Sequence, residues 1–485
     1  MNLRPQRYIL QILLLLNQGI IIAANLDENS WLINSHDSIS YSSRDDLIKA
    51  QGNLHFSDKD VKLWIERSKK GPFVRKGDFT FNSPTDFARI LMNANEFMKN
   101  PSADLWFGTV KPEPNNNFIG MRDAAFLFLL NNDEEYGEKI KQTLLKQIRI
   151  KEADLKNWKD FKGSGGFHMA NFFVRLLYCY DYTKSIYSEE EKRELNIWFR
   201  NIGVYYANFI HSKIKKVFPE RLKSNYNNRL GVAANGKFHA EDITHINKDG
   251  SQGNQIYWVH KRYNNRRSTM AKLVALIGVF LNDEELILHS KIYFTELLKY
   301  GTFPDGTMSE YVRNGDYNNP QQGMIYSSIN IEAITTAAHA MARKGDFYLF
   351  NYKTSEGLYG TEGGSKSIHL IIKNYLNQIS GVEKRYYKSV NEINKLDNYS
   401  ENNHVYWVND CWFLQGNLFY QDSFIDSVCT RSHPGVPKYP IKGIGTAGPI
   451  KNPWSGSGAT FPGYWFMFGG WDKSYWPYPN IRPTN

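Results

Sequence analysis

The chain has 485 residues, of which 41% are hydrophobic and 22% are charged, a balance that is typical of a globular protein and excludes a disordered or membrane-embedded chain. Its formal net charge of +10 favours a polyanionic partner. No zinc-ligand spacing, arginine-rich arm or RNA-binding sheet motif accompanies this charge, so we expect an acidic polysaccharide and no nucleic acid.

Residues 1–24 have the pattern of a signal peptide. Arg4 and Arg7 supply a basic start, an apolar run follows, and small side chains precede Ala24. This pattern predicts cleavage after Ala24 and a secreted or periplasmic protein. A membrane anchor needs about 20 unbroken apolar residues, and an Asn-Gln pair interrupts this run, so we expect no stable membrane insertion after cleavage.

From about residue 83 onward, apolar residues recur at three- and four-residue steps, the spacing of one face of an α-helix. Residues 25–80 are polar and irregular by comparison. The predicted helices begin near Thr85 and then cover 118–130, 135–148, 167–182, 189–211, 255–280, 283–300, 321–343 and 355–378. Long helices in succession predict a mainly α fold, an (α/α) toroid of paired helices spanning residues 25–380, with no strand-rich block before residue 400.

The composition changes after residue 380. Tyr, Trp, Asn, Gly and Pro dominate residues 381–485, which predicts an irregular, partly β extension packed on the toroid. Aromatic residues make up 15% of the whole chain. This content suits a tyrosine-rich core, and it equally suits sugar binding, because aromatic faces stack on pyranose rings.

The helix predicted over residues 167–182 carries a polar and aromatic stripe. Its members follow one another at steps of three, four, three and four residues: His168, Asn171, Arg175, Tyr178 and Tyr182. The stripe is either a solvated outer face or the lining of a sugar-binding groove. In the second case His168, Asn171 and Arg175 are candidate substrate-binding residues.

The stretch from Tyr257 to Tyr326 carries the candidate chemistry, which is β-elimination on a uronic acid. That reaction needs a group that neutralises the sugar carboxylate, a base that removes the C5 proton, and an acid that protonates the departing oxygen. Asn264 and Asn265 precede an apolar helix and are candidate neutralisers, although an Asn in this position is also an ordinary helix cap. Arg266 follows and adds positive potential.

Arg313 and Tyr326 are the next candidates. A free phenol has a pKa of about 10, and a neighbouring guanidinium favours the phenolate, which makes a tyrosine usable as a base. Tyr317 lies closer to Arg313 in the sequence and is the reserve candidate. Glu310 either orients Arg313 or is a surface acid.

Three further candidates lie upstream of the amide pair. His239 is placed in a loop that could reach a cleft and supply a base, and Tyr257 and His260 are candidate substrate-binding residues. No metal-binding spacing such as HExxH is present. We therefore expect neither a metal nor another cofactor.

At these residues the chain resembles the alginate lyase superfamily of (α/α) toroid polysaccharide lyases, families 5 and 38. Three stretches carry the resemblance: the helix 167–182 with the segment after it, Asn264-Asn265-Arg266 before an apolar helix, and Asp305-Gly306 through Arg313 to Tyr326. The resemblance implies that Asn265 neutralises the carboxylate, that Tyr326 acts as acid and base, and that Arg313 supports them. The family often has His directly after the Asn, where this chain has Arg266.

The resulting hypothesis is a secreted polysaccharide lyase that cleaves a uronic-acid polymer, with alginate or glucuronan as the best candidates. A glycoside hydrolase is the first alternative, and it would require two facing carboxyl groups about 5–10 Å apart, such as Asp305 with Glu310 or Glu241 with Asp242. A non-catalytic polyanion-binding protein is the second alternative.

Overall fold

The structure is a computed structural model that describes residues 53–58, 60–62, 65, 86–101, 116–149, 164–210, 263–310, 322–357, 360–379, 412–425 and 478. The elements are α3 (Asp86–Lys99), α4 (Asn116–Asn131), α5 (Glu134–Arg149), α6 (Ser164–Thr183), α7 (Glu189–Ile210), α11 (Asn265–Leu281), α12 (Glu284–Tyr300), α13 (Gln322–Ala342), α14 (Tyr348–Asn351), β1 (Thr354–Gly357), β2 (Gly360–Lys366), α15 (Ile368–Ile379) and α17 (Trp412–Tyr420). The described part of the chain is therefore mainly α, as predicted.

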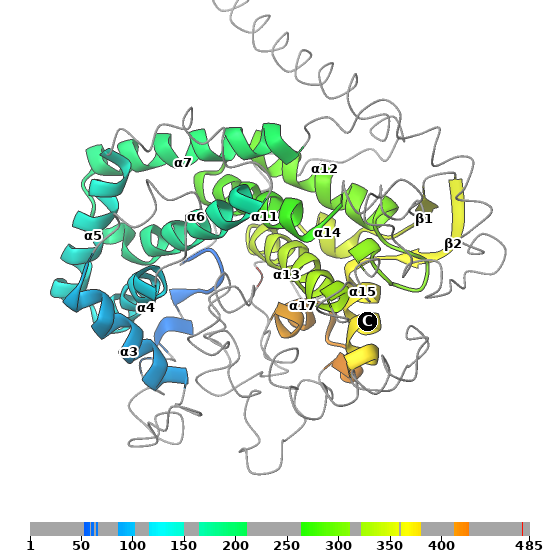
Figure 1. Ribbon diagram of the computed structural model, residues 1–485, viewed down its shortest axis with the longest axis horizontal. Coiled ribbons are helices and arrows are strands. Elements are labelled where there is room, and N and C mark those ends of the chain that lie inside the picture. Colours follow the sequence, from blue (N-terminus) through cyan, green and yellow to red (C-terminus); the bar gives the residue numbers. More distant parts are fainter. Residues whose placement is uncertain are drawn as a thin grey trace, which may run out of the picture.

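The helices form two layers. In the inner layer α4, α6, α11, α13 and α17 each pack against the next, and in the outer layer α5, α7, α12 and α14 do the same. The chain alternates between the layers, from α4 to α5, α6 to α7, α11 to α12 and α13 to α14 (Figure 1). This alternation is the arrangement of an (α/α) toroid and confirms the predicted fold class.

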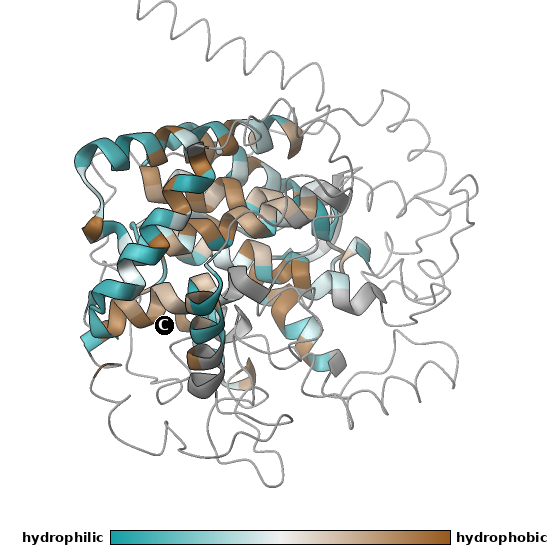
Figure 2. Cartoon of the chain, turned by 60° about the vertical axis from the view of Figure 1, so that its left-hand side comes forward, coloured by the Kyte–Doolittle hydropathy of each residue, from teal (hydrophilic) through white to brown (hydrophobic). Residues whose placement is uncertain are grey.

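The distribution of apolar residues explains the two layers. In α11 every residue from Ser268 to Val279 is buried, as expected for an inner helix that is covered on all sides. In α7 the buried residues recur at steps of mostly three and four, from Leu195 through Phe199 and Ile202 to Ile210, and the exposed residues are polar or charged except for Ile197. Figure 2 shows the same contrast, with hydrophilic residues along the outermost helices and hydrophobic residues inside.

Four inner helices end in the same kind of corner. A residue with positive φ stops the helix, and an aspartate follows and accepts a backbone N–H from the start of the next segment. These corners are Asn132-Asp133, Asn282-Asp283, Gly345-Asp346 and Gln421-Asp422. The sharp reversal they produce brings each chain segment directly back along the outside of the toroid.

The corners lie together at one end of the inner layer. Lys344 Nζ, in the corner after α13, donates to Asn282 Oδ1, in the corner after α11. The rings of Tyr180 and Phe280, near the carboxyl ends of α6 and α11, are 5.0 Å apart. The inner helices are therefore parallel, and their amino-terminal ends share the opposite end of the toroid.

Two sequence predictions require correction. The helix predicted over 355–378 is wrong in its first half, where β1 and β2 pair as an antiparallel hairpin with Glu356 opposite Thr361. Residues 357–364 contain four glycines, which destabilise a helix, and Gly364 has a φ of +71° that few other residues adopt. The helix predicted from residue 255 contains α11, which begins at Asn265 because Asn264 has an extended backbone.

A segment from the amino-terminal part of the chain lies against the inner helices. The backbone N–H of Leu54 donates to Asp181 of α6 at 2.9 Å, and Arg343, just after α13, donates to the Asn53 carbonyl at 3.2 Å. His55 contacts Tyr178 through its Nε2 at 2.9 Å. Residues 53–56 therefore close the interior between α6 and α13.

His339 of α13 joins three parts of the chain. Its Nε2 lies 3.1 Å from the His55 carbonyl oxygen, and its Nδ1 lies 3.0 Å from the Tyr478 hydroxyl. The two imidazoles stack with centroids 5.8 Å apart. Residues near both ends of the chain thus meet on one inner helix.

The boundaries predicted at residues 24 and 380 stay predictions, since residues 1–24 and most residues after 380 lie outside the described ranges. Within those ranges, α17 packs against α13 and α15. None of the described helices combines the length and apolar character that a membrane crossing requires.

The buried imidazoles predict a loss of stability in acid. Burial lowers the pKa of His55 well below 6.5 and that of His339 to about 3, and the positive charge of Arg343 acts in the same direction. Because both values lie below that of an unfolded histidine, the two side chains favour folding above pH 6.5. This contribution is lost as the pH falls from 6.5 toward 3.

Thermal unfolding of the wild type and of His339→Gln between pH 7.5 and pH 4 measures this contribution. We expect the melting temperature of the wild type to fall more steeply below pH 6.5 than that of the variant. Burial raises the pKa of Asp181, so this carboxyl group makes folding more favourable as the pH falls. This opposite effect is present in both the wild type and the variant. Melting temperatures that fall with pH at the same rate in both proteins would contradict this contribution of His339.

Candidate functional site

The amide pair stands at the start of α11. Asn264 is the helix N-cap, and its Oδ1 accepts the backbone N–H of Arg267 at 3.1 Å, which confirms the capping interpretation for this residue. Asn265 is the first helical residue and is 6% exposed. Its side-chain amide makes no hydrogen bond to the described residues.

A rigid shelf, residues 301–310, supports this helix start. Thr302 pairs with Met308 as a β-bridge, and the Ser309 hydroxyl donates to the Tyr263 carbonyl at 3.2 Å. Tyr263 in turn donates from its hydroxyl to Glu296 of α12 at 3.1 Å. Contacts with α12 and with the shelf therefore hold the residues that precede α11 in place.

Glu310 forms the end of this shelf. It is fully buried, and its Oε1 accepts the backbone N–H of Asn265 at 2.5 Å. The first N–H groups of a helix have no partner within the helix, so a carboxylate in this position satisfies one of them and also opposes the positive end of the helix dipole. The alternative that Glu310 is a surface acid is wrong.

The two arginines after the amide pair behave differently. Arg266 lies in the first turn of α11 and its side chain is exposed. Arg267 donates from Nη1 to the carbonyls of Phe209 and Ile210 at 3.1 and 2.9 Å, and so caps the end of α7. Arg266 alone adds positive potential that solvent and a ligand can reach.

Tyr326 lies in the second turn of α13, at the same end of the toroid as Asn265. The two helices are tied by a buried ion pair, in which Lys272 Nζ lies 2.9 Å from Glu332 Oε1. Asn265 precedes Lys272 by seven residues and Tyr326 precedes Glu332 by six, so each lies about 9–11 Å along its helix from the pair. Asn265 and Tyr326 therefore stand at the same level on adjacent helices.

Helical periodicity also fixes their directions. Asn265 is on the same face of α11 as Lys272, the face that meets α13. Tyr326 is about a third of a turn round from Glu332 and is partly buried against the core. One turn further along that face, Asn330 is fully buried, and neither polar atom of its side chain has a hydrogen-bond partner in the described part of the chain.

The stripe on α6 faces inward, so the interpretation as a solvated outer face is wrong. Asn171 is partly exposed, Arg175 is 3% exposed, and Tyr178 and Tyr182 are buried and stack with centroids 6.0 Å apart. Burial, together with the nearby charge of Arg122, lowers the pKa of Arg175 to about 9. The stripe thus leads from the Asn265 end of the toroid into its interior.

The remaining candidates cannot be placed. Arg313, His239, Tyr257, His260 and Tyr317 lie outside the described residues, and of His168 only the backbone, in α6, is described. The structure brings Asn264, Asn265, Arg266 and Tyr326 to one end of the toroid. Asn171 of α6 lies near that same end.

Sequence reasoning missed the role of Glu310 and the pairing of Lys272 with Glu332. A signal for the pair was present, because each is a lone charge within an apolar helical run, and such residues are rarely buried unless they are paired. No comparable signal marks Glu310. Its burial depends on how the shelf folds back under α11.

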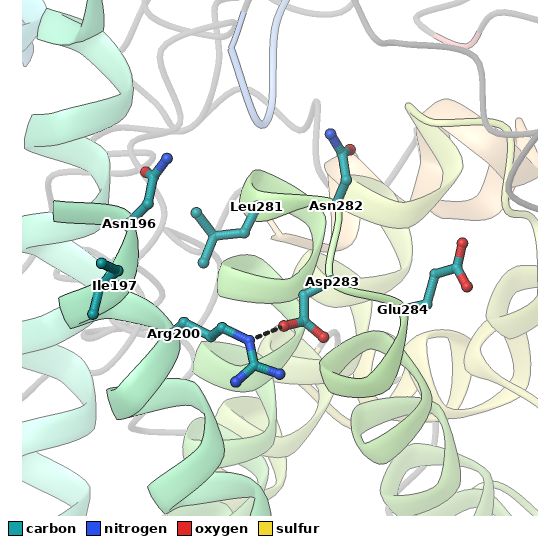
Figure 3. A pocket seen from close by; sticks show the side chains of 7 residues that line it. All are labelled: Asn196, Ile197, Arg200, Leu281, Asn282, Asp283 and Glu284. Atoms are coloured by element: carbon teal, nitrogen blue, oxygen red, sulfur yellow. Dashed lines mark hydrogen bonds and ion pairs between the residues drawn. The ribbon is translucent and has the colours of Figure 1, made fainter. Parts of the chain in front are cut away.

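A surface pocket of about 460 Å³ lies at the other end of the toroid (Figure 3). Asn196, Ile197 and Arg200 of α7 face the corner between α11 and α12 across it, and Arg200 donates to Asp283 at 2.8 Å. It contains none of the predicted site residues. With its arginine already paired to a carboxylate, this pocket does not offer the donor set that a sugar carboxylate requires.

Comparisons with known proteins find likeness in structure only, and it is distant. No protein-family model and no curated protein matches the chain. Among solved structures, an alginate lyase from Bacteroides ovatus is similar over 78% of this chain and 94% of its own, with 11% sequence identity and a TM-score of 0.43. A likeness this distant assigns no residue roles.

The ion pair below the site predicts a measurable stability cost. Lys272→Met leaves the Glu332 carboxylate buried without its cation, and we expect a loss of about 3–5 kcal/mol in the free energy of unfolding. Replacing both residues, as Lys272→Met with Glu332→Leu, should recover most of it. Denaturant titrations measure both effects.

Lys192→Met is the matched control, because Lys192 pairs with Glu189 on the surface of α7. Removing an exposed pair should cost no more than about 1 kcal/mol. Equal losses for Lys272→Met and Lys192→Met would contradict a buried pair between α11 and α13.

Proposed function

We propose that the protein is a polysaccharide lyase that cleaves a uronic-acid polymer by β-elimination, with alginate or glucuronan as substrate. One observation carries the proposal. Asn265 and Tyr326 stand at the same level at the start of two adjacent parallel helices, and the Asn265 amide has no partner among the described residues. The resemblance of their sequence context to (α/α) toroid lyases supports the same reaction.

The chemistry assigns a role to each group. The Asn265 side-chain amide donates to the sugar carboxylate, so that negative charge can spread onto it as the C5 proton leaves. Tyr326 removes that proton and returns one to the departing O4 oxygen, which leaves a double bond between C4 and C5. Arg313, which lies outside the described residues, is proposed to favour the phenolate.

The surroundings of Asn265 suit an anionic sugar. Arg266 adds an exposed cation directly after Asn265. Asn330, on the Tyr326 face of α13, supplies a second amide that has no hydrogen-bond partner among the described residues, and such groups are costly to bury unless something binds them. We further propose that the protein is secreted and meets its polymer outside the cell.

The hydrolase alternative receives less support. Among its candidate carboxylates, Glu310 accepts from the Asn265 backbone and Asp305 accepts from the Thr307 backbone at 2.7 Å. Carboxylates held in this way within the shelf are poorly suited to face each other across a sugar. Glu241 and Asp242 lie outside the described residues.

Ultraviolet absorbance separates the alternatives directly. Incubated with alginate, glucuronan, hyaluronan and chondroitin, the protein should generate an unsaturated, absorbing product from at least one of them. Reducing sugar released without absorbance would favour a hydrolase. Binding without any cleavage would favour a polyanion-binding protein.

Tyr326→Phe tests the proposed proton transfers on the best polymer. The variant should bind the polymer as the wild type does and lose at least about 100-fold in kcat, because it has lost the group that transfers both protons. Tyr205→Phe, a partly exposed tyrosine on the outer helix α7, is the control and should retain full activity. Unchanged turnover by Tyr326→Phe would refute the assignment.

Asn265→Ala tests the neutralising amide. It should lower kcat by about 100-fold, the cost typical of losing one donor to a developing negative charge, while Asn201→Ala on the exposed face of α7 should have no effect. Initial rates measured by absorbance give both values. A variant that keeps wild-type turnover would remove Asn265 from the mechanism.

A further inference from the structure

Among the described residues, Glu310 is a buried acid that contacts the proposed catalytic Asn265 and that the reaction itself does not use. Its carboxylate lies beneath the first turn of α11 and accepts the Asn265 backbone N–H at 2.5 Å. A hydrogen bond from an N–H group to a carboxylate is charge-assisted, and such bonds are stronger than those between neutral groups. Glu310 therefore holds the backbone from which the Asn265 amide projects.

The neighbouring contacts explain why this single bond matters. The Asn264 cap satisfies the N–H of Arg267, and the Ser309 hydroxyl fixes the carbonyl of Tyr263. These contacts hold the residues on either side of Asn265. Within the described part of the chain, Glu310 supplies the only bond to the Asn265 N–H itself.

We propose that Glu310 is a positioning residue, which sets the Asn265 amide at the height where a uronate carboxylate binds. This inference rests on the proposed function, because it gives Asn265 the neutralising role. The buried carboxylate also offsets part of the positive helix end, so that the amide, rather than the helix dipole, makes the directed contact with the sugar.

The first test compares the turnover of three variants with that of the wild type. Glu310→Ala removes the acceptor and should lower kcat by about 10- to 100-fold with little change in KM, since a displacement of about 1 Å has a cost of that order. Glu310→Gln keeps an acceptor oxygen and should restore most of the lost kcat. Glu190→Ala, on the exposed surface of α7, is the matched control and should retain kcat.

A double-mutant cycle separates positioning from a general effect on the fold. In an Asn265→Ala background, Glu310→Ala should change the residual rate by less than about twofold, because there is no amide left to position. Equal losses in both backgrounds would overturn the proposal. So would a folded Glu310→Ala protein with wild-type kcat.

Two further measurements keep the test decisive. If Glu310→Ala does not fold, Glu310→Asp withdraws the carboxylate by one methylene and should lower kcat alone. In wild-type protein labelled with ¹⁵N-asparagine, the Asn265 backbone proton should resonate downfield and move upfield in Glu310→Gln, whether or not the protein cleaves any polymer. An inactive wild type would contradict the proposed function, whereas an unmoved Asn265 resonance would contradict the positioning role.

Discussion

The buried ion pair between Lys272 and Glu332 is the constraint on which the proposed site depends. Apolar contacts between two packed helices are not directional, so on their own they specify the register of the helices less sharply than a pair of charges does. A charge in each that must meet the other fixes this register. With α11 and α13 held in one register, the levels of Asn265 and Tyr326 follow from counting residues back toward the start of each helix.

The repeated corner gives the toroid its polarity. An αL residue followed by a capping aspartate closes four inner helices at one end, where the connections to the outer helices are a few residues long. The stretches of sequence that precede the next inner helix are longer, and they comprise residues 150–163, 211–264, 301–321 and 380–411. The proposed chemistry lies at the amino-terminal ends of the inner helices, and functional residues often lie next to such connecting segments.

Much of this fold could be predicted from sequence, because the regular spacing of apolar residues marks most of its helices. The bounds of α5, α7 and α12 differ from expectation by one or two residues. The hairpin at 354–366 was missed because its apolar neighbours suggest a continuous helix, while its glycines are decisive only once a partner strand exists. At the site, Asn265 and Tyr326 could be singled out by residue type. The role of Glu310 could not be predicted, because the sequence does not show that this acid is buried. Its burial depends on how the shelf packs against the start of α11.

The proposed function requires one sugar unit to contact both α11 and α13. A structure of the Tyr326→Phe variant with a bound uronate tetrasaccharide tests this directly. We expect one uronate to place its carboxylate against the Asn265 amide and its C5 against the ring at position 326. An oligosaccharide bound elsewhere, for example in the pocket beside Arg200 at the other end of the toroid, with the Asn265 end empty, would contradict it.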